Sequence, residues 1–324
     1  MVGFLLFSNS FAPKISSISD PDLDKAVIYL LTQYNPIVGL IPEVPDGDTY
    51  WLLSDNLLAH AILKHYDPSN TTLTNIANNI STTLSNYMKS YGISQISQYN
   101  TLLGSNPYFN NTLSYVITRN SYVIKVHLNN GTSILSPYEY ADIAFLWALH
   151  AYRRGDLQKA IELFSVGAGM YDGVGLNDLP FREGESRGVY QTYKLALYHL
   201  TGQILNQMVP RTVSERIKGL QAPNGGFYTG YYPNGAIPKA VTTNTETTCL
   251  VIYAYSPKII ENYFGRSSTS TQSLQEDPST PSIELISGMG ILLTIIVIIA
   301  YRIRITRIQK PYTTYTNLKK ILGF

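Results

Sequence analysis

Two acidic residues have positions from which a carboxylate can do acid–base chemistry. Asp55 shares one face of a predicted helix with the apolar residues Trp51, Leu58 and Ile62. A carboxylate among apolar side chains is costly to ionise, so burial beside Trp51 is expected to raise the pKa of Asp55. Such a group suits a general acid or base. The alternative is a structural carboxylate that accepts hydrogen bonds from the backbone of a neighbouring loop.

Glu246 is the candidate partner of Asp55. Glycoside cleavage normally requires two carboxylates on opposite sides of the scissile bond, which makes these two residues the predicted catalytic pair. The sequence Thr243-Asn244-Thr245-Glu246 is also typical of a capping box at a helix start. That interpretation explains a glutamate at this position without any substrate.

Other polar and aromatic residues near predicted helix starts or in aromatic loops are candidates for substrate binding. Aromatic rings offer flat apolar faces for stacking, and the chain has 26 tyrosines. The alternative for the aromatic loop 227–232 is a packed turn between helices, and an acid at a helix start can simply favour the helix dipole. The predicted substrate-binding residues are Tyr50, Trp51, Asp142, Gln191, Tyr231 and Tyr232.

No cofactor is expected. His60 and His65 miss the i, i+4 spacing of a helical zinc site, and the sequence has no P-loop and no Gly-x-Gly-x-x-Gly fingerprint. Its single cysteine, Cys249, lies in an apolar helical run and is predicted to be a small buried residue. The net charge of +2 comes from a basic C-terminal tail. The rest is close to neutral, so we expect neither a nucleic-acid nor a nucleotide partner.

Helical periodicity dominates residues 15–265, which are predicted to form one domain. Ser136 and Glu139 predict a capping box with Pro137 at the first helical position. A β-hairpin is predicted at 113–118 and 122–128. The expected helices cover about 21–31, 49–66, 70–91, 137–152, 156–164, 189–205, 213–220 and 243–255.

Alternate helices of this series are weakly similar to one another. Each has a polar residue beside an apolar helix start: Asp55, Asp142, Gln191 and Glu246. Inner helices that alternate with outer ones are the arrangement of an α/α toroid, in which outer helices pack on the backs of an inner ring.

Three segments resemble the α/α-toroid superfamily. They are Tyr50-Trp51-Leu52-Leu53-Ser54-Asp55-Asn56, the loop Leu220-Gln221-Ala222-Pro223-Asn224-Gly225-Gly226-Phe227, and Asn244-Thr245-Glu246-Thr247-Thr248. The superfamily includes six-hairpin glycosidases, sugar epimerases, polysaccharide lyases, and terpene cyclases or prenyltransferases. The resemblance spans about 45–256 and implies a mainly α toroid, partial or complete, because four or five hairpins are countable rather than six. No residue matches a catalytic motif of any one family.

Outside this domain the sequence predicts a membrane anchor. Residues 285–301 are uninterruptedly apolar, long enough for a short transmembrane helix, and a basic tail follows at 302–324. The positive-inside rule places that tail in the cytoplasm and the N-terminal domain outside the cell. Residues 266–284 read as a Ser/Thr/Pro stalk, and residues 1–14 as a signal-peptide remnant, with a true start upstream. Four sequons predict glycosylation at the cell surface: Asn70, Asn79, Asn110 and Asn130.

These observations predict a membrane-anchored extracellular toroid that binds glycans or another envelope component without catalysis. The alternative is a hydrolase or lyase that uses acid–base carboxylates in the toroid mouth. A third interpretation, an accessory subunit of a membrane complex, stays open because the basic tail can contact a partner or anionic lipid.

Overall fold

The computed structural model describes residues 20–45, 47, 50–91, 98–105, 113–119, 122–128 and 135–265. The predicted signal remnant 1–14, the stalk 266–284, the anchor 285–301 and the tail 302–324 lie outside these residues, as do the sequons at Asn110 and Asn130. Within the described part of the chain, no helix has the length and apolar character needed to cross a bilayer.

The described chain is mainly helical, as the periodicity predicts. Its helices are α1 (Leu23–Gln33), α2 (Leu53–His65), α3 (Thr71–Tyr91), α4 (Ala141–Arg153), α5 (Leu157–Ala168), α6 (Leu179–Arg182), α7 (Thr192–Ile204), α8 (Arg211–Gly219), α9 (Thr245–Tyr255) and α10 (Pro257–Phe264), with a short 3₁₀ turn, η1, at Gln98–Thr101. Neither α10 nor α6 was predicted from the sequence.

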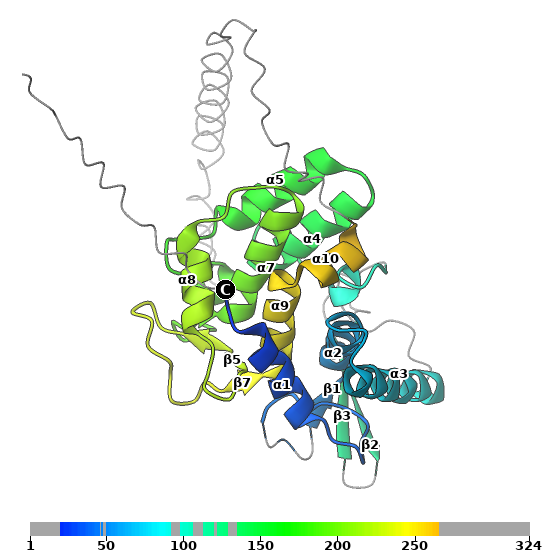
Figure 1. Ribbon diagram of the computed structural model, residues 1–324. Coiled ribbons are helices and arrows are strands. Elements are labelled where there is room, and N and C mark those ends of the chain that lie inside the picture. The colour runs from blue at the N-terminus through cyan, green and yellow to red at the C-terminus, as the bar shows by residue number, and fades with distance from the viewer. Residues whose placement is uncertain are drawn as a thin grey trace, which may run out of the picture. The chain divides into compact units, whose positions relative to one another are not determined.

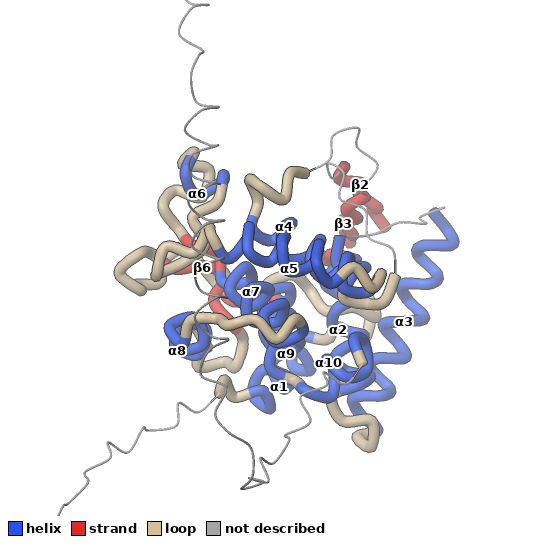
Figure 2. Tube along the Cα trace, turned by 90° about the horizontal axis from the view of Figure 1, so that it is seen from above, coloured by secondary structure: helices blue, strands red, loops and turns tan. Residues whose placement is uncertain are grey.

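The four helices predicted to be equivalent form the interior: α4 packs on α7, α7 on α9, and α9 on α2. Figure 2 shows α7, α9 and α2 in succession, with α3 beyond α2. These helices are apolar nearly all round, and residues 249–254 of α9 are buried without interruption, which is typical of a helix covered on every side.

The remaining long helices pack outside this series and bury one stripe each. In Figure 1, α5 covers α4 and α3 lies against α2. The stripe of α5 is Ala160, Leu163, Phe164 and Gly167, at the i, i+3, i+4, i+7 spacing of an amphipathic helix. Helix α8 packs on α7, and α1 and α10 contact α9.

The strands are short, and three of them lead directly into helices. The predicted hairpin is confirmed as β2 (Leu113–Arg119) and β3 (Tyr122–Leu128), and β1 (Tyr50–Leu52) adds a parallel strand to β3 that the sequence did not predict. Two further pairs join β4 (Tyr190–Gln191) to β6 (Gly230–Tyr231) and β5 (Phe227–Tyr228) to β7 (Thr243–Asn244). Strands β1, β4 and β7 lead directly into α2, α7 and α9, so each of these inner helices starts from a backbone-paired residue.

The predicted start of α4 is wrong. Residues 136–139 form a turn, in which the Glu139 N–H donates to the Ser136 carbonyl at 3.1 Å, and the helix begins at Ala141. The Ala141 N–H donates instead to Asp178 Oδ2 at 3.1 Å. A residue 37 positions away thus caps this helix, and local sequence gives no sign of such a cap.

Candidate functional site

The first turns of the inner helices carry the acidic residues that the sequence singled out. Asp55 is the third residue of α2, Asp142 the second of α4, and Glu246 the second of α9, while Tyr193 is the second of α7. Two further residues belong with them: Glu43, whose charge acts on Asp55 and Glu246, and Tyr99, whose hydroxyl is hydrogen-bonded to Glu246. We call these six residues the carboxylate–tyrosine cluster.

Glu246 is the partly exposed acid of the cluster. The Tyr99 hydroxyl donates to Glu246 Oε1 at 2.6 Å. Burial raises the pKa of Glu246 to about 7, the negative charges of Glu43 and Asp142 add to the rise, and the Tyr99 hydrogen bond opposes it. At neutral pH, Glu246 therefore populates both its acid and its base form, as a general acid–base catalyst requires.

Asp55 is fully buried. The Ser54 hydroxyl donates to its Oδ1 at 3.2 Å, and its Oδ2 has no hydrogen-bond partner within the described residues. Burial, followed by the charges of Glu246 and Glu43, raises the pKa of Asp55 well above its ordinary value. Burial is thus the main cause that disfavours ionisation of Asp55, and the charge of Glu246 adds to it.

Asn56, the neighbour of Asp55, anchors the first turn of α2. Its side-chain amide donates to the carbonyls of Ile41 and Leu52, both at 2.9 Å, and its Oδ1 accepts the Ile41 N–H at 2.7 Å. These bonds join the segment around residue 41 to the first turn of α2. The backbone groups of Ile41 and Leu52 are thereby paired in the interior, where unpaired ones would be costly.

Asp142 and Tyr193 form a second pair in the cluster. The Tyr193 hydroxyl donates to Asp142 Oδ2 at 3.1 Å, while Asp142 Oδ1 is buried with no hydrogen-bond partner in the described chain. Burial and the charges of Asp142 and Glu246 raise the pKa of Tyr193 well above its ordinary value. Burial also raises the pKa of Tyr99 well above its ordinary value, and the charge of Glu246 is the largest of the charges that add to this rise. Both tyrosines therefore stay protonated and act as hydrogen-bond donors.

A buried ion pair holds the start of α4 against α7. Lys194 Nζ lies 2.6 Å from Asp178 Oδ2, and both side chains are almost completely buried. Asp178 Oδ2 also accepts the Ala141 N–H. Since Lys194 follows Tyr193 and Ala141 precedes Asp142, this pair fixes the two helix starts that bring Tyr193 to Asp142.

The structure brings the predicted catalytic residues together. Asp55 and Glu246 belong to one electrostatic cluster, and Asp142 joins them. The capping-box interpretation of Glu246 is wrong, because Thr243 lies in β7 and Asn244 caps α9 by accepting the Thr247 N–H at 2.9 Å. The Glu246 side chain is therefore not used in a capping box, and it accepts the hydrogen bond from Tyr99 instead.

The predicted aromatic platform is largely internal. Trp51 and Tyr231 are fully buried, whereas Tyr232 is 41% exposed. Gln191 pairs with Gly230 through the backbone and precedes α7 without a side-chain capping bond. The side chain of Tyr50 lies outside the described part of the structure. Stacking on a sugar thus stays a prediction for Tyr232 and Tyr50, while Trp51 and Tyr231 have no exposed ring face.

The remaining predictions concern modification and cysteine chemistry. Asn70 and Asn79 are exposed, and Asn70 also caps α3 by accepting the Thr72 N–H at 3.1 Å. Their glycosylation stays a prediction. Cys249 is buried, as expected.

Sequence reasoning missed Tyr99, Tyr193, Glu43 and the Lys194–Asp178 pair. Tyr193 follows Gln191 by two residues and lies on the helix predicted to be equivalent to α2 and α9, so the internal similarity could have indicated it. Tyr99 comes from a short 3₁₀ turn with no pattern around it. Among the described residues, no cluster of His, Cys, Asp and Glu is suited to hold a metal ion.

No protein-family model matches the chain, and neither the curated proteins nor the solved structures contain a significant match.

Proposed function

We propose that this protein is an extracellular, membrane-anchored α/α-toroid protein that hydrolyses glycans at the carboxylate–tyrosine cluster. The observation that carries the proposal is Glu246, a partly exposed carboxyl with a pKa of about 7, held by Tyr99 beside Asp142 and Asp55. Perturbed carboxyl groups that gather at one place are characteristic of catalytic sites.

In the proposed reaction, Glu246 in its acid form donates a proton to the glycosidic oxygen as the bond to the leaving sugar breaks. A water molecule attacks the anomeric carbon, its oxygen forms the new bond there, and the Asp142 carboxylate, 7% exposed, accepts its proton. The Tyr193 hydroxyl orients Asp142 through its bond to Oδ2. Asp55 is fully buried and its raised pKa favours the neutral form, so we assign it no direct contact with substrate.

The charge of the cluster favours hydrolysis of neutral glycans over lyase chemistry. A lyase that acts on uronates must neutralise the sugar carboxylate. Within the described residues, the cation closest in sequence to the cluster, Lys194, is already paired with Asp178. The acidic cluster would repel a uronate at the point of cleavage, because like charges in a poorly solvated site are strongly unfavourable.

Support for the toroid comes from the helix packing. The neighbours α4, α7, α9 and α2 form a continuous inner series, and α5, α8 and α3 pack outside it. This matches the alternation of inner and outer helices in a toroid. The anchor at 285–301 and the outward orientation of the domain rest on the apolar run and basic tail alone.

The test uses the full chain in a neutral detergent with a panel of neutral polysaccharides, and measures new reducing ends. We expect activity that Glu246→Gln and Asp142→Asn each reduce by about 100-fold or more, the scale of a lost acid or base. Asp55→Asn replaces a buried carboxyl group, whose raised pKa favours the neutral form, by a neutral amide and should retain most of the activity. Glu162→Gln, at an exposed site on α5, is the matched control. Equal activity in Glu246→Gln and the wild type would refute the assignment.

Glycan binding without catalysis is the second candidate function. It is favoured by the burial of the other two acids, since Asp55 is 0% and Asp142 7% exposed. In that case Glu246 and the protonated tyrosines would serve as hydrogen-bonding partners for sugar hydroxyls. Binding of a polysaccharide with no new reducing ends would decide for this candidate.

A further inference from the structure

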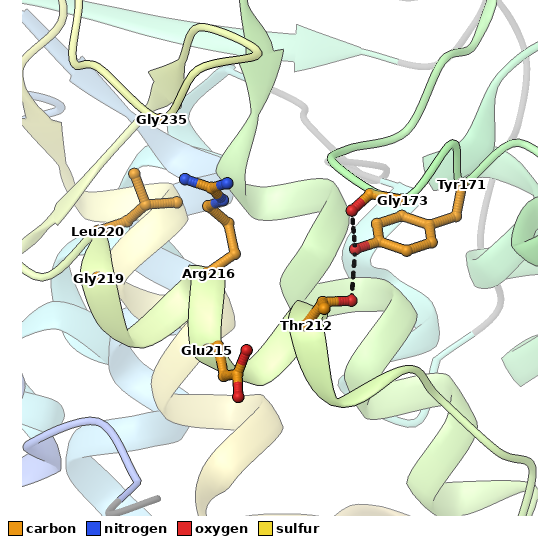
Figure 3. Close-up of a pocket in the computed structure, with 8 residues that line it drawn as sticks. All are labelled: Tyr171, Gly173, Thr212, Glu215, Arg216, Gly219, Leu220 and Gly235. Atoms are coloured by element: carbon orange, nitrogen blue, oxygen red, sulfur yellow. Dashed lines mark hydrogen bonds between the residues drawn. The ribbon is translucent and has the colours of Figure 1, made fainter.

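A surface pocket lies along one face of α8, and none of its lining residues belongs to the carboxylate–tyrosine cluster. Its volume is about 230 Å³, below the roughly 300–1,000 Å³ of sites for drug-sized ligands. Figure 3 shows the guanidinium of Arg216 next to Gly235, and the hydroxyl groups of Tyr171 and Thr212 on the other side. The size suits a ligand of about one sugar ring.

Arg216 is held in place but has free hydrogen-bond donors. Its guanidinium carbon lies 5.1 Å from the ring centroid of Tyr231, which is itself fixed by a 2.8 Å bond from its hydroxyl to the Val174 carbonyl. Gly235 makes room for it, because a Cβ there would lie 2.4 Å from Arg216 Nη1. Within the described residues, the guanidinium forms no ion pair and donates no hydrogen bond. Its N–H fork therefore remains available to an anion.

The other polar groups of the pocket offer acceptors. The Tyr171 hydroxyl donates its proton to the Gly173 carbonyl at 3.0 Å, so Thr212 Oγ1, 2.9 Å away, donates to Tyr171. Both hydroxyl protons are thereby used, and lone pairs remain. Glu215 Oε1 is paired with Arg211 Nε at 3.0 Å, which leaves its second oxygen as an acceptor and offsets its charge. Such acceptors match the hydroxyl groups of a ligand.

We propose that this pocket binds a sugar that carries one acidic group, with the carboxylate or sulfate on Arg216 and the sugar hydroxyls on Tyr171, Thr212 and Glu215. The choice of a sugar rests on the proposed function. The inference extends that function, because it names the substrate class as glycans whose acidic units are recognised away from the neutral bond that is cleaved.

The experiment is a ligand-observed NMR titration of the full chain in neutral detergent with D-glucuronate, D-glucose 6-sulfate and uncharged D-glucose. We expect one or both acids to bind more tightly than glucose, and the preferred acid distinguishes a uronate from a sulfate ester. Arg216→Gln should weaken acid binding by about 10- to 100-fold, the effect of losing hydrogen bonds to a charged group. Tyr171→Phe, which keeps the arginine and removes one acceptor, should weaken it less.

Lys218→Gln is the matched control, because it removes a cation from α8 outside the pocket lining and should change the affinity by less than about three-fold. The proposal is overturned if neither acid binds more tightly than glucose, or if Arg216→Gln binds the acids as the wild type does. Glu246→Gln should lose hydrolysis but keep acid binding at the pocket, because Glu246 does not line it. The two proposals can therefore fail separately. Acid binding in a chain that hydrolyses no polymer refutes the hydrolase alone, and hydrolysis without acid binding refutes the pocket alone.

Discussion

The hydroxyl of Tyr99 donates a 2.6 Å hydrogen bond to Glu246, a residue 147 positions later in the chain. This bond joins the turn at η1 to the first turn of α9. It also opposes the rise in the pKa of Glu246 that burial causes. The proton affinity of the proposed catalytic acid is therefore set by residues from three separate segments: Tyr99, Glu43 and Asp142.

Tyr99→Phe should raise the pKa of Glu246 further above 7, because the variant loses a donor that stabilises the ionised form. The variant should lose about 1–2 kcal/mol of unfolding free energy at pH 8.5, where Glu246 is ionised, and less at pH 5. Thermal melts at the two pH values measure the difference. Tyr66→Phe, which removes a 2.7 Å bond to the exposed Asp24, is the matched control. A loss that is equal at both pH values would contradict the assignment.

Glu246→Gln should stabilise the fold at high pH. The pKa of Glu246 is raised on folding from 4.5 to about 7. Between these values the native state holds a proton that the unfolded state has released, so stability falls as pH rises through this window. With about 1.4 kcal/mol per pKa unit and a discount for solvent screening, the gain of the variant above pH 8 is roughly 1–3 kcal/mol.

That gain should vanish below about pH 4.5, where both states of the wild type are protonated. Urea unfolding at a series of pH values measures it. A constant difference between variant and wild type from pH 4 to pH 9 would show that the pKa of Glu246 is not raised on folding.

Lys194→Met should be among the most destabilising single changes in the domain. It leaves the buried Asp178 carboxylate without its 2.6 Å partner, and breaking a buried pair costs about 3–5 kcal/mol. Lys159→Met, which breaks a pair of similar length with Glu162 at an exposed site, should cost less than about 1 kcal/mol. Denaturant unfolding compares the two. Similar losses in both variants would mean that the Lys194–Asp178 pair does not hold α4 to α7.

Gly225→Ala tests the contact between the loop after α8 and helix α1. Gly225 has a φ of +91°, and a Cβ there would lie 2.3 Å from the backbone carbonyl oxygen of Lys25. We expect a loss of about 2–4 kcal/mol, since overpacking adds to the cost of a left-handed alanine. Gly155→Ala has a similar φ of +79° and open space around the Cβ, so it measures the backbone cost alone. Equal melting temperatures of the two variants would contradict the close approach.

The sequence predicted the helical framework well, because each helix carries its own signal. Helices α1, α3 and α5 and the hairpin of β2 and β3 follow from periodicity alone. The similarity among alternate helices identified α2, α4, α7 and α9 as the inner series and placed Asp55, Asp142, Gln191 and Glu246 at equivalent positions, although α7 contributes Tyr193 rather than Gln191 to the cluster. That three of these four residues gather in one cluster was not predicted from the sequence.

What the sequence could not predict depends on contacts between distant residues. The cap of α4 comes from Asp178, 37 positions away. The parallel pairing of β1 with β3 joins segments separated by more than 70 residues, and no local pattern encodes it. Local sequence also misassigned Glu246: the capping-box pattern is present, but the backbone pairing of Thr243 in β7 places the cap one residue later, at Asn244.

The most direct test of the account is the ionisation of Glu246 itself. Chain labelled with ¹³C at the glutamate carboxyl carbon would be titrated by NMR, and Glu246→Gln would assign the resonance by its disappearance. We predict a midpoint of about 7, raised by burial and by the neighbouring acids. A midpoint near the ordinary value of 4.5 would show that Glu246 is a solvated surface acid and would contradict the proposed acid–base site.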